Sequence, residues 1–441
     1  MSNFEVKGTP TRGLLGSTLG FFIGFAAVVA LGSTARFFGP QLIESGASIL
    51  LVGLLVAMPN LSGSLLRIPF AAWSDTVGGR KPMLILLCLS IIGLIGLVFI
   101  AYFIFPLGIT LIHYPILLIL AFLAGCGIAT FSVGISQTSY WFPQKEQGKA
   151  LGRYAGVGNL APGIFSLIMA FSLSAWGLGG SYLLWFILLL CGTLLYYIIG
   201  LDACSFQLEK IGASNDQIVA YCLAEYGQEL FFTHNLKESL SMSIRKWKTW
   251  TLIGLYFTSF GGFIALAAWF PIYWISLHNV GTVNVGGLEL SLALILTAIF
   301  IIIGSLVRVF SGSLADKISG ILVSTIGLLI LLIGAIVMIS ATSASFNLAL
   351  IGMVLISIGM GMVNAGVFKM VPKTVPEAVG GAAGWIGGLG AFGGFVIPPL
   401  MGFIVDIMQE QGYSFGFVVF LILALISLLI VFILNQKKDQ K

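Results

Sequence analysis

Charged residues are scarce in this sequence. Only 8% of its 441 residues are Asp, Glu, Lys or Arg, and 58% are hydrophobic. An ordinary soluble domain has about 25% charged residues. The composition therefore excludes a soluble globular protein and predicts a chain that crosses a membrane several times.

Histidine and cysteine are also scarce. The three histidines do not cluster, so no metal site is predicted. Walker and GxSxG patterns are absent, which argues against ATP hydrolysis and other catalysis. We therefore expect neither an enzyme nor a cofactor. No CxxC pair occurs, and we interpret the five cysteines as free packing thiols: Cys88, Cys126, Cys191, Cys204 and Cys222.

Long apolar runs are abundant instead. Runs of about 20 residues are long enough to cross a bilayer as helices, and a helix satisfies its own backbone polar groups in lipid. The expected fold class is therefore an all-α membrane protein. Twelve helices are predicted, at about residues 13–39, 48–73, 82–106, 115–142, 149–173, 179–201, 248–276, 287–314, 321–341, 344–368, 380–405 and 413–435.

Basic residues indicate the orientation of these helices. In a twelve-span arrangement nearly all of the 21 Lys and Arg residues fall on one side, and basic loops usually face the cytoplasm. We therefore expect a multi-pass protein of the cell membrane with both termini in the cytoplasm. The net charge of +5 then reflects topology, so no nucleic-acid partner is expected. Membrane lipid is the expected surrounding, and we expect a monomer.

The longest polar stretch divides the spans into two sets of six. We expect an N-terminal half at residues 1–201, a cytoplasmic linker at 202–247 and a C-terminal half at 248–441. Within the linker, Ser214 and Gln217 resemble a capping box at the start of a helix. The run IVAYCLAEYGQELFF that follows either forms an amphipathic helix on the cytoplasmic surface or stays irregular.

One motif occurs in both halves. Residues 63–79 read GSLLRIPFAAWSDTVGG, and residues 304–320 read GSLVRVFSGSLADKISG. Each copy places an arginine, Arg67 or Arg308, eight residues before an aspartate, which corresponds to about 12 Å of helix. Both arginines are thus expected near the middle of an apolar core about 30 Å thick. A cation at that depth is costly and usually marks a substrate path.

The two arginines allow two interpretations. They either bond to carbonyl or carboxylate groups of neighbouring helices, or they bind an anionic substrate. All 16 Asp and Glu residues fall at span ends or in loops, so no carboxylate is expected at that depth. Because a guanidinium fork can give two parallel hydrogen bonds, the pattern favours a small planar oxyanion.

Aromatic and amide side chains are predicted near that anion. Aromatic rings at similar depth either clamp a flat anion or only pack against one another. An amide inside the membrane needs a partner, which makes Asn159 a candidate ligand and Asn364 a weaker one. The aromatic candidates are Tyr256 and Phe260, one helical turn apart, and the more ambiguous Phe21, Phe25 and Phe131.

Glycines cluster in AGVGNLAPG at residues 155–163 and in GAAGWIGGLGAFGG at residues 381–394. Small residues let helices approach closely. Their spacing indicates helix contact, and the family resemblance given in the next paragraph implies that the helices carrying them also slide or bend as the two halves move. The six assigned to this role are Gly156, Gly158, Gly163, Gly384, Gly387 and Gly388.

These residues together resemble the nitrate/nitrite porter family of the major facilitator superfamily. The resemblance covers nearly the whole chain and is carried by LLRIPF, AGVGNLAPG, LYFTSFGGF, GSLVRVFSGSLAD and VFKMVPK. It implies two pseudo-symmetric six-helix bundles around a midplane site. It also implies a set of substrate ligands, namely Arg67, Arg308, Tyr256, Phe260, Phe131 and Asn159.

The loops after the two arginine motifs resemble the superfamily's Asp-Gly-Arg signature. This resemblance implies that Asp75, Arg80 and Asp316 latch helices across the halves on the cytoplasmic side. Two departures from the family's segments are Pro162 in the first glycine run and the GSTARF segment of the first span.

The resemblance implies secondary transport of nitrate, nitrite or both by alternating access. Since no carboxylate or histidine is expected near the centre, exchange of nitrate for nitrite is favoured over proton-coupled nitrate symport. Two further alternatives are a carrier for another small or organic anion and a receptor that binds an anion without moving it.

Overall fold

The computed structural model describes residues 6–228, 236–374 and 379–436. Eleven helical segments within these ranges are long and apolar enough to cross a membrane. The longest, Ala150–Ile199, contains Gly177 with φ 65° and ψ −166°, which divides it into two crossings. The described residues therefore contain twelve helical segments suited to cross a membrane, the number that the sequence predicts.

The first bundle precedes the linker. Its first helix begins with Thr9, whose side chain accepts from the N–H of Arg12, and with Pro10 at the first helical position. Its helices are α1 (Pro10–Phe25), α2 (Ala35–Glu44), α3 (Ile49–Leu65), α4 (Arg67–Val77), α5 (Arg80–Phe99), α6 (Tyr114–Gly125), α7 (Thr130–Ser139), α8 (Gln144–Asn159) and α9 (Ala161–Ile199).

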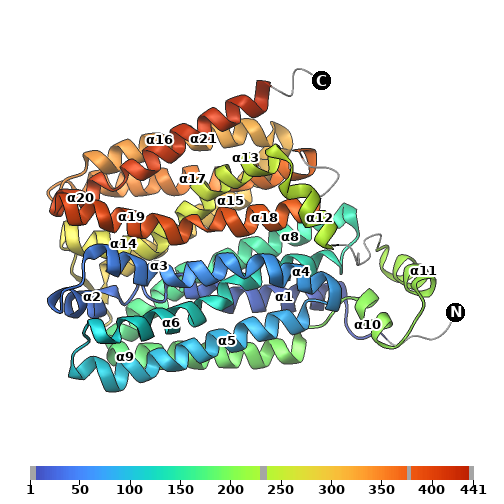
Figure 1. Cartoon of the computed structure of the whole chain (residues 1–441), viewed down its shortest axis with the longest axis horizontal. Helices are drawn as coiled ribbons and strands as arrows, with labels where there is room; N and C mark the ends of the chain where they lie inside the picture. The colour runs from blue at the N-terminus through green and yellow to red at the C-terminus, as the bar shows by residue number, and fades with distance from the viewer. Residues whose placement is uncertain (1–5, 229–235, 375–378, 437–441) are drawn as a thin grey trace.

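The second bundle packs beside the first, and the start of α1 and the end of α21 lie at the same end of the molecule as the linker helices (Figure 1). This arrangement is the pair of six-helix bundles that the sequence predicts. Its helices are α13 (Trp247–Tyr256), α14 (Gly262–His278), α15 (Leu292–Lys317), α16 (Gly320–Ser340), α17 (Phe346–Thr374), α18 (Val379–Ala391), α19 (Gly393–Met408), α20 (Glu410–Phe415) and α21 (Val418–Gln436).

The linker contains three short helices, α10 (Cys204–Lys210), α11 (Asn215–Tyr226) and α12 (Leu236–Ile244). The capping box is confirmed, because Ser214 and Gln217 exchange their side-chain and backbone hydrogen bonds at the start of α11. The helix ends at Gly227 in the left-handed conformation. The predicted helical run is therefore shorter than expected, and residues 229–232 of it lie outside the described ranges.

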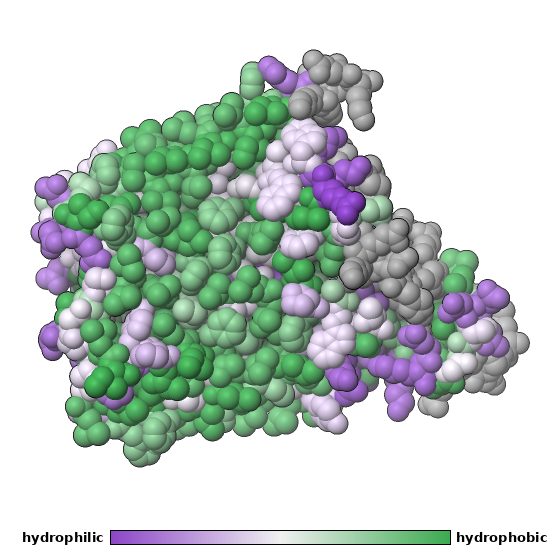
Figure 2. Space-filling view, viewed as in Figure 1, coloured by the Kyte–Doolittle hydropathy of each residue, from purple (hydrophilic) through white to green (hydrophobic). Residues whose placement is uncertain are grey.

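We call the end of the molecule that carries the linker the linker side. The opposite end, where α2 and α20 lie, is called the hairpin side after a β-hairpin that follows α14 (Figure 1). The hairpin consists of strands β1 (Thr282–Val285) and β2 (Leu288–Ser291), which pair antiparallel after α14. Between the two ends, the visible lateral surface is largely hydrophobic, and hydrophilic residues concentrate at the ends (Figure 2). Such an apolar belt is the surface that lipid requires.

The hairpin corrects the predicted eighth span, which was expected to begin at residue 287. Gly286 and Gly287 both have positive φ, 61° and 87°, and this geometry suits a two-residue hairpin turn. The side chains of Thr282 and Asn284 donate to Glu289 at 2.5 and 2.9 Å, and these bonds hold the pKa of Glu289 below its usual value. The helix therefore begins later, at Leu292.

The first span is also interrupted. The structure ends α1 at Phe25, forms a 3-10 turn over Ala26–Val29 and starts α2 at Ala35. Gly32, in the unusual GSTARF segment, lies so close to the Ala268 carbonyl of the second bundle that a Cβ would overlap it. The interruption thus brings the two backbones into contact.

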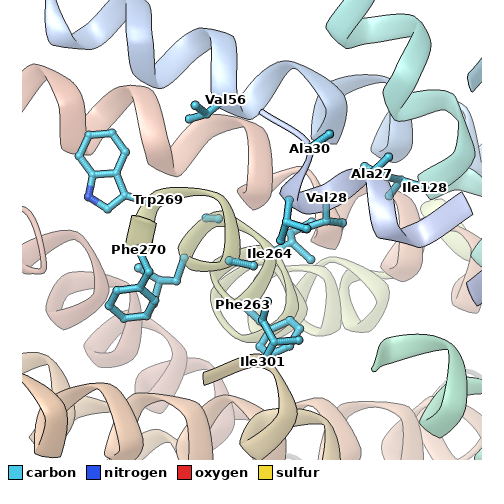
Figure 3. Packing of buried hydrophobic residues seen from close by; sticks show 14 of the residues in the cluster. Ala27, Val28, Ala30, Val56, Ile128, Phe263, Ile264, Trp269, Phe270 and Ile301 are labelled. Atoms are coloured by element: carbon cyan, nitrogen blue, oxygen red, sulfur yellow. The ribbon is translucent and has the colours of Figure 1, made fainter. Parts of the chain in front are cut away.

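One hydrophobic core is shared by both bundles. Figure 3 shows buried residues of both bundles in one cluster, which includes Val28 and Ile128 of the first bundle and Phe263 and Ile264 of the second. All four side chains are at most 3% exposed. The two bundles are therefore held together mainly by apolar packing, and polar contacts between them stand out.

Candidate functional site

Arg67 follows a break in the second crossing. Leu66 separates α3 from α4, and Arg67 is the first residue of α4. Pro69 lacks the N–H that would bond the carbonyl of Leu65, so the helix is interrupted beside the arginine. The span runs from residue 49 to residue 77, and Arg67 therefore lies well inside it, with its side chain fully buried.

The guanidinium of Arg67 is only partly satisfied. Its Nη1 donates to the carbonyl of Gly387 in the second bundle at 2.8 Å, while Nε and Nη2 have no partner among the described residues. Its Cζ lies 5.0 Å from the ring centre of Phe131 and 5.3 Å from that of Phe260. Unpaired donors on a buried cation are costly, so these N–H groups are available to an anion.

Arg308 is the corresponding residue of α15 and is half-buried. Its Cζ lies 5.6 Å from the ring centre of Phe260 and 5.8 Å from that of Phe368. Its Nη1 has no partner in the described ranges. Arg67 and Arg308, from opposite bundles, thus approach the same Phe260 ring.

No carboxylate neutralises these arginines in the part of the chain that the structure describes. An ion pair of the described residues joins Lys210 and Asp202 in the linker, at 2.6 Å and away from both arginines. The two guanidinium groups are also close enough to repel each other. Of the two interpretations of the sequence, bonding to a neighbouring carbonyl accounts for one N–H of Arg67 only. The site therefore carries an excess of positive charge.

A stack of aromatic rings connects the two arginines. Residues Phe257–Gly261 form a π-helical turn between α13 and α14, a distortion that is frequent at functional sites. Phe260, within this turn, stacks on Tyr256 at 4.8 Å between ring centres and on Phe25 at 6.1 Å, with an angle of 8° in both pairs. Phe131 adds a further ring at 6.1 Å from Phe260. The predicted aromatic residues are therefore brought together.

Phe21 of α1 lies against this stack with its ring tilted. Its ring centre lies 4.9 Å from that of Phe25 and 5.1 Å from that of Phe131. The Tyr256 hydroxyl, at the other end, lies near Arg308. The rings of Phe21, Phe25, Phe131, Tyr256 and Phe260 are at most 1% exposed.

The two predicted asparagines are buried, with exposed fractions of 2% for Asn159 and 3% for Asn364. The Oδ1 atom of each has no partner within the described ranges. Asn159 ends α8, just before Pro162 interrupts the fifth crossing, and its backbone carbonyl accepts from Ser305 of the second bundle at 3.1 Å. Asn159 therefore lies at the boundary between the bundles.

Four of the predicted glycines face the other bundle. A Cβ on Gly156 would be 3.1 Å from Val309, and one on Gly163 would be 3.1 Å from Ile302. For the second bundle, a Cβ on Gly388 would lie 2.8 Å from Ile68, and one on Gly387 would lie 3.9 Å from Ser132 and 4.0 Å from Phe131. These four glycines thus allow close approach between the bundles.

The remaining two glycines have different neighbours. A Cβ on Gly158 would overlap the Phe21 ring within the first bundle, and one on Gly384 would lie 3.7 Å from Leu240 of α12. Gly158 therefore makes room for the aromatic stack, and Gly384 faces the linker.

Sequence reasoning missed two aromatic residues at the site. Tyr154 of α8 donates to the carbonyl of Phe131 at 2.7 Å, and its ring centre lies 5.1 Å from that of Phe21. Phe368 of α17 lies over Arg308 and meets Tyr256 edge to face at 5.1 Å. The sequence signals for these two positions are the tyrosine that directly precedes the first glycine run and the phenylalanine of VFKMVPK.

The predicted latch residues have local partners here. The carboxyl group of Asp75 lies near the hydroxyl groups of Ser136 and Tyr140 of the first bundle. Arg80 donates from Nη2 to the carbonyl of Tyr197 at 2.7 Å, and its backbone N–H donates to Asp202 at 2.9 Å. The side chain of Asp316 lies outside the described part of the chain. The latch therefore stays a prediction.

Comparisons with known proteins match this architecture. A family model described as Major Facilitator Superfamily matches residues 14–398 and 291–441. Among solved structures, the partially occluded inward open conformation of the xylose transporter XylE from E. coli superposes with a TM-score of 0.70. That alignment covers 96% of this chain and 98% of the other at 16% sequence identity, so it supports the fold alone.

Curated relatives are more similar in sequence. The chain is 31% identical over 409 residues to the probable nitrate/nitrite antiporter NarK1 of Thermus thermophilus, covering 88% of this chain and 83% of that protein. It is 25% identical to the nitrite extrusion protein of Bacillus subtilis, covering 86% of this chain and 84% of the relative. The chain belongs to the nitrate/nitrite porter family of the Major Facilitator Superfamily.

Proposed function

We propose that this protein is a secondary transporter that exchanges nitrate and nitrite across the cell membrane by alternating access. The observation that carries the proposal is the arginine pair. Arg67 and Arg308 come from opposite bundles, approach one aromatic ring and retain unpaired N–H donors. The names of the relatives, nitrate/nitrite antiporter and nitrite extrusion protein, support the same substrates.

The site suits a small, flat anion. Guanidinium forks offer parallel N–H donors in one plane, which match two oxygens of a planar oxyanion. The closely stacked rings of Tyr256, Phe260 and Phe25 provide flat apolar surfaces beside these donors. Asn159 supplies an amide at the boundary of the bundles. We assign the anion to the two arginines, with these groups and Phe131 around it.

Exchange follows from the charge of the site. Arginine keeps its proton across the physiological pH range, so the site has no evident group to carry a proton with the substrate. When the site is empty, two cations repel each other as the bundles close around them. A bound anion offsets that repulsion, so the loaded carrier changes conformation more readily than the empty one.

The proposed orientation places the linker side in the cytoplasm. In a twelve-span arrangement most of the Lys and Arg residues fall in the termini, the linker and the loops of that side, including Lys7, Arg12, Lys210 and Arg245, and such charge favours the cytoplasmic side. The hairpin side then faces outward. The predicted division into an N-terminal half, linker and C-terminal half, and the latch formed by Asp75, Arg80 and Asp316, belong to the same proposal.

Counterflow is the direct test of exchange. In proteoliposomes, nitrite trapped inside should accelerate the entry of labelled nitrate at least about ten-fold over empty vesicles, because the return of an empty site is slow. A pH gradient alone, with no anion inside, should produce little uptake. Equal uptake driven by the pH gradient alone would favour proton-coupled symport.

The same vesicles separate the remaining alternatives. Phosphate or a dicarboxylate in excess should not compete with nitrate, whereas competition by either would indicate a carrier for a different anion. Nitrate binding without counterflow would indicate a receptor.

Tyr154 offers a milder test of the aromatic stack. The Tyr154→Phe variant loses the hydrogen bond to the carbonyl of Phe131, which is worth about 1 kcal/mol. Since Phe131 lies against Arg67, the KM for nitrate should rise about five-fold while the maximal rate changes little. Counterflow over a range of nitrate concentrations measures both values. The Tyr102→Phe variant, at an exposed position, is the control; a similar KM in both variants would contradict the role of Tyr154.

A further inference from the structure

The bundles meet closely along α3 and α19. A Cβ on Gly53 of α3 would lie 2.8 Å from the Pro398 carbonyl of α19. A Cβ on Gly402 of α19 would lie 2.8 Å from the Ile49 carbonyl and 3.0 Å from the Cα of Leu50. The two backbones are thus in contact on the hairpin side, and this seam must separate whenever that side opens.

Polar contacts cross this seam at three depths. Arg67 bonds to Gly387 at the site, and Asn60 donates to the carbonyl of Gly394 at 3.2 Å. The third contact lies at the hairpin end, where the carboxylate of Asp406 meets the start of α3. Of the three, this contact is the one that uses an acidic side chain.

Both carboxylate oxygens of Asp406 accept hydrogen bonds from the first turn of α3. Its Oδ1 accepts from the N–H of Ile49 at 2.8 Å, and its Oδ2 accepts from the N–H of Leu50 at 3.0 Å. The first N–H groups of a helix have no intrahelical acceptor, and the helix dipole favours a negative charge there. Charge-assisted bonds of this kind are stronger than neutral ones. Asp406 therefore joins α19 of the second bundle to α3 of the first. We call its two hydrogen bonds to Ile49 and Leu50 the clamp.

We propose that Asp406 is a gating residue of the transport cycle, whose carboxylate holds the hairpin side closed and releases the start of α3 when that side opens. The proposal rests on the alternating access proposed above. It assigns Asp406 to the positioning of α3 and not to contact with the anion, since Asp406 lies far along the seam from Gly387.

Accessibility from the hairpin side tests the clamp. A reporter cysteine at Val56, a residue of α3 that is 1% exposed, is labelled with a membrane-impermeant maleimide in oriented vesicles. The exposed Cys88 and Cys191 are replaced by serine in all proteins. Asp406→Asn should raise the labelling rate about ten-fold or more, because the charge that holds the closed state is lost.

Two further variants make the result specific. Glu410→Gln removes an exposed acid near the same end and should leave labelling unchanged. Ile49→Pro removes one donor of the clamp, and proline fits this position because Ile49 begins the helix and Ser48 before it is extended, with φ −81° and ψ 163°. Ile49→Pro should therefore also raise labelling.

The outcomes decide the proposal. If Asp406→Asn and Ile49→Pro label at the parental rate, Asp406 is not a gate. If Asp406→Asn yields no folded protein, the parental rate in Ile49→Pro overturns the proposal and a raised rate supports it. The labelling measures opening without reference to the substrate. Failure of nitrate counterflow together with raised labelling would therefore overturn the proposed function and retain the gate.

Discussion

Replacing Arg67 or Arg308 by lysine is expected to lower nitrate exchange at least about a hundred-fold. Lysine keeps the charge but loses the planar fork, and hydrogen bonds to charged groups are worth about 1.5 to 3 kcal/mol. The Nη1 bond from Arg67 to Gly387 would also be lost. Initial rates of nitrate counterflow measure the effect, and the melting temperature of the purified protein shows that the variants remain folded.

Arg153→Lys is the matched control. Arg153 is an exposed arginine of α8, and its replacement should leave counterflow within about two-fold of the parent, as is usual for surface substitutions. Wild-type rates in Arg67→Lys or Arg308→Lys would remove that arginine from the site.

Gly388→Val is expected to lower the exchange rate by at least about ten-fold. A Cβ at residue 388 would lie 2.8 Å from Cγ1 of Ile68 and 3.4 Å from the carbonyl of Ser64, and overpacking of this kind costs about 1 to 3 kcal/mol. Because these contacts join α18 to the other bundle, the cost falls on the closed arrangement around Arg67. The rate of nitrate counterflow and the equilibrium affinity for nitrate are both measured. The counterflow rate should fall by a larger factor than the affinity.

A second substitution that relieves the steric clash makes the Gly388→Val prediction specific. Ile68→Ala removes the atom that the new side chain would strike, so the double variant with Gly388→Val should recover part of the lost rate. Gly152→Val is the control, since a Cβ at that position meets nothing within 4 Å. Equal losses in Gly388→Val with and without Ile68→Ala would show that the steric explanation is wrong.

The sequence predicted the parts of the fold that depend on local composition. Apolar run length identified the twelve crossings, and the repeated motif identified Arg67 and Arg308, because an arginine inside an apolar run is conspicuous in any sequence. The capping box of Ser214 and Gln217 could also be predicted, because its two residues lie only three positions apart and form a local motif.

Features that depend on contacts between distant residues could not be predicted. The carbonyl of Gly387 bonds to Arg67 from 320 residues away, and nothing in the glycine run marks that one carbonyl. Tyr154 acts through the backbone of Phe131, a partner that a side-chain motif does not reveal. The second strand of the hairpin, Leu288–Ser291, was included in the predicted eighth span because Leu288 and Leu290 are typical of the following apolar helix.

We expect the unequal burial of Arg67 and Arg308 to set the order in which the two arginines meet the anion. Arg67 is fully covered, whereas Arg308 keeps part of its surface exposed. On the proposed function, an anion arriving in this conformation would meet Arg308 first. At Arg67 it would meet Nε and Nη2, which have no partner among the described residues, beside Nη1, which is bonded to the carbonyl of Gly387. We therefore propose that Arg308 binds the anion first and Arg67 second, so that two arginines that are equivalent in the repeat act one after the other.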